Sequence, residues 1–245
     1  MNILVIGEKC IDIFIYGDCY RLSPEAPVPV IMPNNIVKND GMAGNVVNNI
    51  FAIDKEINVD IWSQNQEITK TRYVDRKTNH MFLRVDKGEE GISEMETFHN
   101  KISEISKYDI VIVSDYDKGF ISTEMLKQIG HSSKLSILDS KKILSKEIIE
   151  KFTFVKMNES ESKQNSQINT MGNVIVTLGS MGAKFKGTLF PSPKPQETID
   201  VSGAGDTFTA SFILKYYKTK DVNKSISYAN EMSSIVVSRR GVSTV

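Results

Sequence analysis

Residues 108–115 read YDIVIVSD, an unbroken apolar run that ends in a serine and an aspartate. Three similar segments follow it: KLSILDSK (134–141), FTFVKMNE (152–159) and NVIVTLG (173–179). Apolar runs of strand length are typical of strands that are buried on both faces, and helix-like or linking segments separate these four. The pattern predicts an α/β fold with a mostly parallel central sheet flanked by helices.

Segments on either side of these runs fit the same fold. ILVIG (3–7) and MFLRVD (81–86) are predicted to be strands, and GNVVNNIFAI (44–53) is predicted to be a helix. MLKQIG (125–130) is predicted to be a helix that ends on its glycine. With 245 residues, of which 40% are hydrophobic, the chain is expected to form a single domain over residues 1–245.

A second region has a different pattern. Residues 10–32 and 69–86 show a period of two, with prolines and turn residues in place of helical spacing. The prolines favour edge strands or extended connections. We expect two β-ribbons, near 12–33 and 68–88, that pair into a small sheet over the main domain. Such a sheet is either a packing accessory or a lid that excludes water from a reacting centre.

Charge and hydropathy exclude two classes of partner. Thirty basic and thirty acidic residues give a formal net charge of zero, so no overall field attracts nucleic acid or an anionic membrane. No apolar run approaches the ~20 residues of a membrane span. NILVIG (2–7) is too short for the core of a signal peptide and has no basic stretch before it. We therefore expect neither a nucleic-acid partner nor a membrane partner.

The cysteines and histidines give no sign of a metal site or a disulfide. Cys10 and Cys19 do not have the CxxC spacing and are expected to be reduced thiols in a cytoplasmic protein. The three histidines are scattered, which gives little support to a histidine metal site or a Ser-His-Asp triad.

Polar side chains follow the end of each of the four apolar runs. They are Ser114 and Asp115, Asp139 and Lys141, Asn158 and Glu161, and Thr177 and Gly179. Ligands of open α/β sheets bind beyond the carboxyl ends of the strands. Polar residues after a strand are also ordinary in loops, but four successive instances favour a shared site.

The segment DVSGAGDTF (200–208) precedes an apolar run and starts a predicted helix. Three of its residues have little or no side chain, so a phosphate can approach their backbone N–H groups: Gly203, Ala204 and Gly205. In the structural alternative, Ser202 caps the helix and Asp206 meets the helix dipole. A carboxylate beside a phosphate is otherwise unfavourable, so Asp206 is predicted to accept a proton from a hydroxyl that attacks phosphorus.

DVSGAGDTF resembles the signature of the ribokinase-like sugar kinases. Four further segments resemble the branch that acts on D-glycero-β-D-manno-heptose 7-phosphate, the kinase half of bifunctional heptose kinase/adenylyltransferases: RLSPEAPVPV (21–30), TKTRYV (69–74), SDYDKG (114–119) and RRGVSTV (239–245). The resemblance implies a Rossmann-like core with a β-sheet lid, ATP as the donor, Mg²⁺ as the divalent cation and a sugar phosphate as the acceptor. A homodimer through the β-lid is a candidate assembly.

The resemblance also implies roles for single residues. Asp206 matches the catalytic base, and residues 203–205 match the anion hole. Asp12 and Asn45 match residues that bind the sugar. Residues that match the nucleotide or metal site are Asn158, Glu161, Thr177, Gly179, Gly182 and Asn230. Asn158 has a structural alternative, because it could begin an Asx-turn before a helix.

Several cations are candidates for phosphate contacts. Arg72 and Arg84 have side chains that suit a sugar phosphate, although surface arginines on a β-ribbon are common. Lys70 falls on the same strand face as Arg72. Lys118, beside Asp115 in the expected substrate site, and Lys141, on the nucleotide side, contact phosphate if the loops converge and are solvated if not.

The sequence departs from the family in four places. GMAGN (41–45) carries Met42 where the family has glycine, and a methionine reaches positive φ less easily, so this turn is expected to differ. Segments 52–66 and 165–173 are shorter than in the family. The sequence ends at Val245, so we expect neither the family's last helix nor an adenylyltransferase half after it.

The leading hypothesis is an enzyme that transfers the γ-phosphoryl group of ATP to the anomeric hydroxyl of the heptose 7-phosphate, giving the 1,7-bisphosphate. One alternative is a kinase for another sugar phosphate. Another is a sugar- or nucleotide-binding sensor or partner subunit without catalysis. Asp206 and its flanking glycines favour an enzyme, because a binding protein gains nothing from a base, whereas the shortened segments favour the binding protein.

Overall fold

A computed structural model of the chain describes residues 1–193, 201–239 and 244–245. Asp200 and residues 240–243, which belong to two of the motifs that carry the resemblance, lie outside the described residues. Eight strands form the main sheet in this spatial order: β12 (Thr188–Phe190), β11 (Ala183–Phe185), β10 (Val174–Thr177), β9 (Phe154–Asn158), β8 (Ser136–Ser140), β7 (Ile110–Asp115), β1 (Asn2–Gly7) and β4 (Asn58–Trp62). The six strands from β10 to β4 are parallel, and β11 and β12 are antiparallel.

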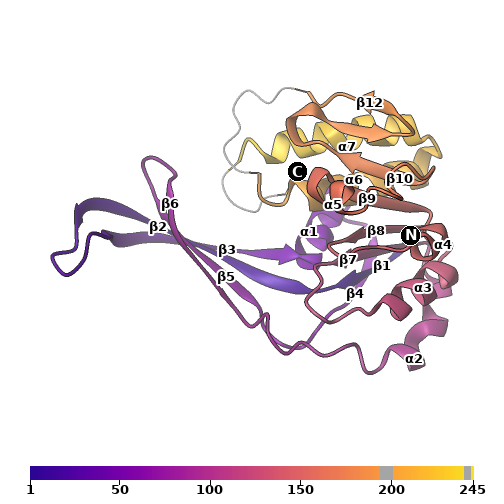
Figure 1. Cartoon of the computed structure of the whole chain (residues 1–245), viewed down its shortest axis with the longest axis horizontal. Helices are drawn as coiled ribbons and strands as arrows, with labels where there is room; N and C mark the ends of the chain where they lie inside the picture. The colour runs from indigo at the N-terminus through magenta and orange to yellow at the C-terminus, as the bar shows by residue number, and fades with distance from the viewer. Residues whose placement is uncertain (194–200, 240–243) are drawn as a thin grey trace.

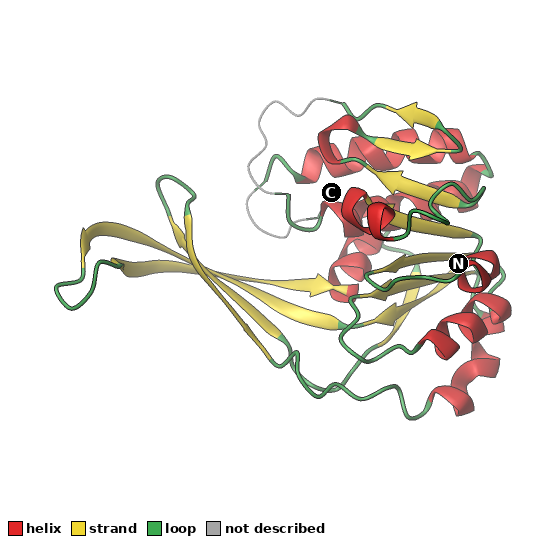
Figure 2. Cartoon of the chain, viewed as in Figure 1, coloured by secondary structure: helices red, strands yellow, loops and turns green. Residues whose placement is uncertain are grey.

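Helices cover both faces of this sheet (Figures 1 and 2). One face packs against α1 (Ala43–Ile53), α6 (Ala204–Thr219) and α7 (Val222–Val236). The other packs against α2 (Phe98–Lys101), η1 (Ile102–Lys107), α3 (Thr123–Ser132) and α4 (Lys146–Lys151). Alternate strand residues enter the two cores, so the strands are buried on both sides. The predicted α/β fold with a mostly parallel sheet is confirmed.

The predicted second sheet is a long, twisted arm that projects from the α/β body (Figure 1). Its strands, in the order β3-β2-β5-β6, are β3 (Pro29–Met42), β2 (Lys9–Leu22), β5 (Thr69–Asp75) and β6 (Met81–Lys87). Pro29 opens the edge strand β3, as its missing N–H requires. The first ribbon runs from Lys9 to Met42 and is longer than the predicted segment 12–33. We call this four-stranded sheet the lid.

One predicted helix end was wrong, and Met42 has a positive φ although it is not a glycine. The helix α3 passes through Gly130 and ends at Ser132. A Cβ at position 130 would lie 2.7 Å from Lys151 Cβ, so the glycine permits close packing against α4 and does not end the helix. Met42 adopts φ +57° despite its side chain, which is buried against Cys10 and Ile68. That conformation is costly for a residue other than glycine and occurs where the surroundings enforce it.

Two short helical segments follow the strands nearest the predicted site. They are α5 (Glu159–Gln164), directly after β9, and η2 (Gly179–Met181), after β10. None of the helices within the described part of the chain combines the length and apolarity needed to span a membrane.

Candidate active site

Asp206 lies in the first turn of α6, and it is 5% exposed. Asn45 Nδ2, from the start of α1, donates to Asp206 Oδ2 at 2.9 Å, and the Tyr116 hydroxyl donates to Oδ1 at 3.1 Å. Burial raises the pKa of Asp206 to about 6, with Asp139 also raising it, while these two hydrogen bonds and Lys156 act in the opposite direction. A carboxylate with this pKa is ionised at neutral pH and basic enough to accept a proton.

The glycine turn before Asp206 is shaped by backbone conformation. Gly203 occupies the N-cap position with φ +82°, and no side chain caps the helix, so the structural alternative of a Ser202 cap is not observed. Ala204 N–H donates to the Val201 carbonyl at 3.3 Å. The first-turn amides of a helix have no carbonyl partner within it, and they carry the positive end of the helix dipole. This end of α6 is therefore suited to a phosphate.

A buried ion pair lies beneath this turn. Lys156 Nζ, on β9, is 2.7 Å from Asp139 Oδ2, on β8. A Cβ added to Gly205 would lie 3.3 Å from the same Nζ, so the ammonium group abuts the glycine. Asp139 raises the pKa of Lys156 against the effect of burial, which keeps the cation charged. Asp139 Oδ1 is buried and has no hydrogen-bond partner among the described residues.

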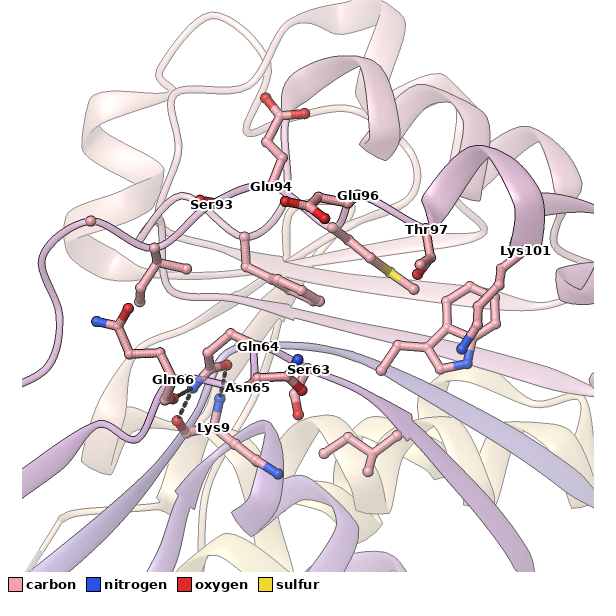
Figure 3. Close-up of a pocket in the computed structure, with 16 residues that line it drawn as sticks. Lys9, Ser63, Gln64, Asn65, Gln66, Ser93, Glu94, Glu96, Thr97 and Lys101 are labelled. Atoms are coloured by element: carbon pink, nitrogen blue, oxygen red, sulfur yellow. Dashed lines mark hydrogen bonds between the residues drawn. The ribbon is translucent and has the colours of Figure 1, made fainter.

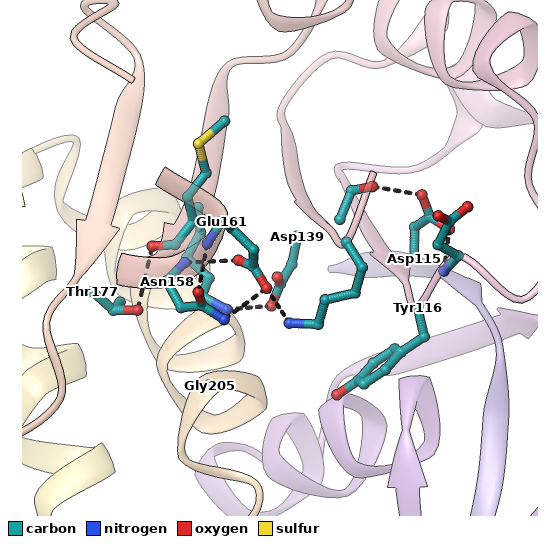
Figure 4. A network of polar contacts seen from close by, with 12 residues as sticks. Asp115, Tyr116, Asp139, Asn158, Glu161, Thr177 and Gly205 are labelled. Carbon is teal, nitrogen blue, oxygen red and sulfur yellow. Dashed lines mark hydrogen bonds and ion pairs between the residues drawn. The ribbon is translucent and has the colours of Figure 1, made fainter. Parts of the chain in front are cut away.

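Asn158 and Glu161 form a capping box at the start of α5 (Figure 4). Asn158 Oδ1 accepts from Glu161 N–H at 2.9 Å, and Glu161 Oε2 accepts from Asn158 N–H at 2.7 Å. Glu161 Oε1 accepts from Asn158 Nδ2 at 2.7 Å and also from Lys141 Nζ. The Asx-turn alternative is thus observed, and Lys141 joins the cluster.

Asp12 occupies the inner face of β2, where the lid meets the body. Its carboxylate accepts from the guanidinium of Arg72, which also lies over the ring of Phe14 with Cζ 4.8 Å from the centroid. Cys10 Sγ lies 3.6 Å from Asp12 Oδ2. A Cβ at Gly41 would be 2.0 Å from that oxygen, so β3 approaches Asp12 only because residue 41 has no side chain.

The other candidate cations are each paired with a carboxylate. Glu89 lies 3.0 Å from Lys70 Nζ and 2.6 Å from Lys118 Nζ. Arg84 makes two 2.8 Å hydrogen bonds to Asp86. β5 and β6 pair across a turn that contains Asn79, which places Arg72 directly opposite Arg84.

Asp115 ends β7 and supports the neighbouring loops. Its Oδ2 accepts from the Ser140 hydroxyl at 2.6 Å, and its Oδ1 lies 3.0 Å from Lys142 Nζ. The side chain is fully buried in these contacts. Asp115 thus joins the ends of β7 and β8.

The four remaining candidates lie around β10, β12 and α7. The Thr177 hydroxyl donates to the Met157 carbonyl at 3.3 Å, and Gly179 has φ +57° with open space around it. Gly182 has φ +100°, and a Cβ there would lie 2.1 Å from the Phe190 carbonyl oxygen. Asn230 Nδ2 donates to that same carbonyl at 2.9 Å. These contacts fix the strand ends at the edge of the site.

Two cavities differ in their relation to Asp206. One, of about 710 Å³, borders Asn45 and extends along α1 between β3 and Arg239; Asn39, Asn48 and Lys55 also line it. The other, of about 580 Å³, lies beside the end of β4 and the segment 91–97 (Figure 3). None of the predicted site residues lines the second cavity. We call the first one the α1 cleft.

Three polar residues of the site were missed, of which Glu8 and Lys156 are buried. Glu8 is fully buried and accepts three backbone N–H groups from residues 116–120, Tyr116 contacts Asp206, and Lys156 supports Gly205. Lys156 interrupts an apolar run, and Glu8 directly follows one. Because charged residues are rarely buried without a partner, a charge at either position could have indicated a site residue.

The chain is similar to one family over most of its length. The family described as pfkB family carbohydrate kinase matches residues 54–245. A relative from Nitratiruptor sp. named Bifunctional protein HldE is 28% identical over 297 residues, with 99% of this chain and 63% of the relative covered. A Helicobacter pylori relative of the same name is 30% identical over 296 residues, with 98% and 64% covered.

The chain therefore spans a little under two thirds of the length of these relatives. The alignments are longer than the chain's own 245 residues, so the chain lacks segments that the relatives have, as the shortened stretches of the sequence predicted.

Solved structures with low identity share the fold. The ribokinase of Thermotoga maritima has a TM-score of 0.74 at 17% identity, with 98% of this chain and 94% of that chain covered. Phosphofructokinase-2 from Escherichia coli, in complex with potassium, has a TM-score of 0.71 at 15% identity, with 98% and 93% covered.

Proposed function

We propose that this chain, which belongs to the pfkB family of carbohydrate kinases, phosphorylates the anomeric hydroxyl of D-glycero-D-manno-heptose 7-phosphate. The chain is an ATP-dependent sugar kinase. The observation that supports phosphoryl transfer is the buried carboxylate of Asp206 beside the N-terminal turn of α6. The likeness to two-part HldE proteins along the whole chain supports the heptose, and the product would be the 1,7-bisphosphate.

In this proposal the sugar lies between Asp12, Asn45 and Asp206. Asp12 accepts hydrogen bonds from sugar hydroxyls at the base of the lid, and Asn45 orients the carboxylate of Asp206. Asp206 accepts the proton of the attacking hydroxyl as the new P–O bond forms and the bond to ADP breaks. The first-turn amides of α6 stabilise charge on the transferred group, an effect worth on the order of 3 kcal/mol for one preorganised donor.

The triphosphate would lie along the strand ends from Gly205 to Gly179. Lys141 and Asn158 lie on that path, with Thr177 and Gly182 beyond them. The open space around Gly179 leaves room for a ligand next to its backbone. Asn230 then acts through the Phe190 carbonyl, at the far edge of the nucleotide side.

The donor set fits a magnesium ion held mainly by phosphate. Within the part of the chain that the structure describes, no cluster of three acidic, histidine or cysteine side chains could hold a metal, and both Glu161 oxygens already accept hydrogen bonds. Asp139 Oδ1 is buried without a hydrogen-bond partner among the described residues. We therefore expect Glu161 and Asn158 to reach the ion through water. When bound, a magnesium ion would neutralise charge on the transferred and leaving groups.

The phosphate at the far end of the acceptor would bind to cations of the lid. Arg72 and Arg84 lie opposite each other on the inner face, and Lys70 lies on the same face. Each is paired with a carboxylate, so the phosphate would compete with Asp86 for Arg84. Lys55 and Arg239 at the other end of the α1 cleft are the alternative.

The outer face of the lid supports a homodimer. Ile36, Ile15, Tyr73 and Leu83 lie directly opposite one another across all four strands, on the face away from Asp12. Ile36 is 58% exposed and Leu83 is 54% exposed. An apolar row of this kind is suited to packing against the lid of a second copy.

Release of ADP measured across a panel of sugars and sugar phosphates tests the acceptor. We expect the heptose 7-phosphate to give the highest kcat/KM, with the unphosphorylated heptose at least tenfold lower. Higher turnover of another sugar phosphate would replace the heptose and leave the sugar kinase in place. ATP binding without turnover of any sugar would instead favour the sensor or partner-subunit alternative.

A further inference from the structure

Tyr116 lies in the loop after β7 (Figure 4). Its hydroxyl reaches the carboxylate of Asp206. It donates to Oδ1 at 3.1 Å, while Asn45 donates to Oδ2 at 2.9 Å. Each carboxylate oxygen therefore accepts one hydrogen bond from the protein and keeps a further lone pair. A substrate hydroxyl can use that lone pair without displacing either donor.

The loop that carries Tyr116 is anchored by Glu8, which is fully buried between β1 and β2. Glu8 Oε2 accepts from Tyr116 N–H at 2.8 Å. Glu8 Oε1 accepts from Lys118 N–H at 3.1 Å and from Phe120 N–H at 3.3 Å. Charge-assisted hydrogen bonds of this kind are roughly twice as strong as neutral ones. Glu8 therefore fixes the position of the loop through three of its backbone N–H groups.

The same residue is tied to the second donor of Asp206. The Glu8 carbonyl accepts from Ala43 N–H at 2.9 Å, at the start of the helix that carries Asn45. One residue therefore holds the two segments whose side chains converge on Asp206.

We infer that Tyr116 is a positioning residue that keeps Asp206 oriented and ionised as the base, and that Glu8 holds Tyr116 in place; this rests on the proposed role of Asp206. A buried carboxylate tends to take up a proton, and a protonated carboxyl cannot act as a base. Hydrogen bonds donated to the ionised form oppose that tendency.

The charged groups around the pair act in both directions. Asp139, on β8, raises the pKa of Asp206, and Lys156, on β9, lowers it. Lys70 Nζ and Lys141 Nζ lie 5.8 Å and 5.5 Å from the centre of the Tyr116 ring. Burial, and then the charge of Asp206, raise the pKa of Tyr116 well above its usual range, so its hydroxyl stays protonated and remains a donor.

The test is the Tyr116→Phe variant, with Tyr108→Phe as a matched control. Tyr108 also donates to an aspartate, Asp60, at 2.7 Å, but on the surface. In a carbon-13 NMR titration of the aspartate carboxyls, with the Asp206 signal assigned by Asp206→Asn, we expect Tyr116→Phe to raise the Asp206 pKa by about one pH unit. The control should leave it unchanged. An unchanged Asp206 pKa in folded Tyr116→Phe overturns the inference, whatever the substrate is.

Kinetics gives a second, independent measurement. With any sugar that the wild type phosphorylates, kcat/KM of Tyr116→Phe should fall about fivefold more than that of Tyr108→Phe at pH 6, and the difference should narrow above pH 8. Equal losses at every pH would assign Tyr116 a packing role and overturn the inference. If no sugar is phosphorylated, the proposed function fails while the NMR titration still decides the role of Tyr116.

A Glu8→Gln variant tests the anchor. A glutamine has one acceptor oxygen, and its NH₂ group would face a backbone N–H. We expect Glu8→Gln to raise the Asp206 pKa in the wild type and to add nothing in the Tyr116→Phe background. Additive shifts would show that Glu8 acts on Asp206 without Tyr116. If Glu8→Gln does not fold, the Tyr116→Phe titration alone decides.

Discussion

At the scale of single residues, Asp206 is the proposed base, and burying its charged carboxylate lowers the stability of the fold. Its pKa of about 6 in the folded chain exceeds the ordinary aspartate value of 3.8. The folded state therefore binds a proton more tightly than the unfolded state. The resulting stabilisation is fully present below about pH 4 and is lost as the pH rises through about 6. Above pH 6 the ionised, buried carboxylate costs about 3 kcal/mol.

This predicts opposite effects of Asp206→Asn on activity and stability. We expect the variant to lose phosphoryl transfer by at least ~100-fold. Its free energy of unfolding at pH 8 should be equal to or higher than that of the wild type, while at pH 4 the difference should shrink. Urea unfolding at the two pH values and an ADP-release assay check both parts. A folded variant with nearly normal turnover would remove Asp206 from the role of base.

For the wild type, kcat/KM should fall about tenfold for each pH unit below about 6, as Asp206 takes up a proton. A pH profile of kcat/KM for the acceptor sugar, measured from pH 4.5 to 8.5, checks this expectation. A flat acid limb would mean that Asp206 does not titrate in the free enzyme.

Gly205→Ala should separate turnover from folding. A methyl group at this position would crowd Lys156 Nζ, which lies 3.3 Å from the added Cβ. Alanine is the better helix former by up to about 1 kcal/mol, so the fold should not weaken. We expect kcat/KM for ATP to fall about tenfold and further in Gly205→Val, whose branched side chain blocks the phosphate. Gly172→Ala is the control, because its Cβ meets only Lys186 Cε at 3.6 Å. Wild-type ATP kinetics in both position-205 variants would reject the phosphate cradle.

The sequence indicated individual candidate residues more readily than the partners they contact in the structure. Asp206, Asn45 and the glycine turn stand in short motifs whose chemistry is local. The hydrogen bond between Asn45 and Asp206 joins residues 161 positions apart, and that between Tyr116 and Asp206 joins residues 90 apart. Partners at such separations depend on how the strands are ordered in the sheet. Polar residues are common in the loops that follow strands, so the sequence did not indicate that Tyr116 contacts Asp206.

At the scale of elements, the strands were predictable and some of their ends were not. Continuous apolar runs identified β7 to β10, because only strands covered on both faces need them. Gly130 was a poor end marker for α3, since a glycine inside a helix can also serve close packing. The length of β2 and β3 depends on the pairing register of the lid, which no local pattern contains.

The lid also makes a prediction about the acceptor. We expect Arg84→Lys to raise KM for the phosphorylated sugar about five- to tenfold and to leave KM for ATP unchanged, because lysine cannot bind phosphate in the bidentate way. Arg72→Lys should raise KM similarly and also disturb Asp12. Arg76→Lys, which changes a lid arginine paired with Asp18, is the control. If Arg84→Lys has no larger effect than the control, Lys55 and Arg239 in the α1 cleft become the candidates for binding the phosphate of the sugar.

At the scale of the whole molecule, the exposed apolar row of the lid predicts the state of assembly. Leu83→Glu should shift the protein from dimer to monomer in light scattering, because a buried unpaired carboxylate is unfavourable at an apolar interface. Leu189→Glu, at a residue of similar exposure on β12, should have no effect. A wild-type protein that is monomeric at high concentration would leave the outer face of the lid without this role.

The position of Cys10 makes chemical labelling a measure of how often the base of the lid opens. Cys10 is 4% exposed, and burial together with Asp12 raises the pKa of its thiol to about 12, so almost no reactive thiolate exists while the lid base is packed. Cys19, half-buried further out on the same strand, provides an internal reference. The rate at which an alkylating reagent modifies Cys10, relative to Cys19, therefore measures how often the base of the lid opens in the wild-type protein. A sugar that binds at Asp12 would slow the first reaction and leave the second unchanged.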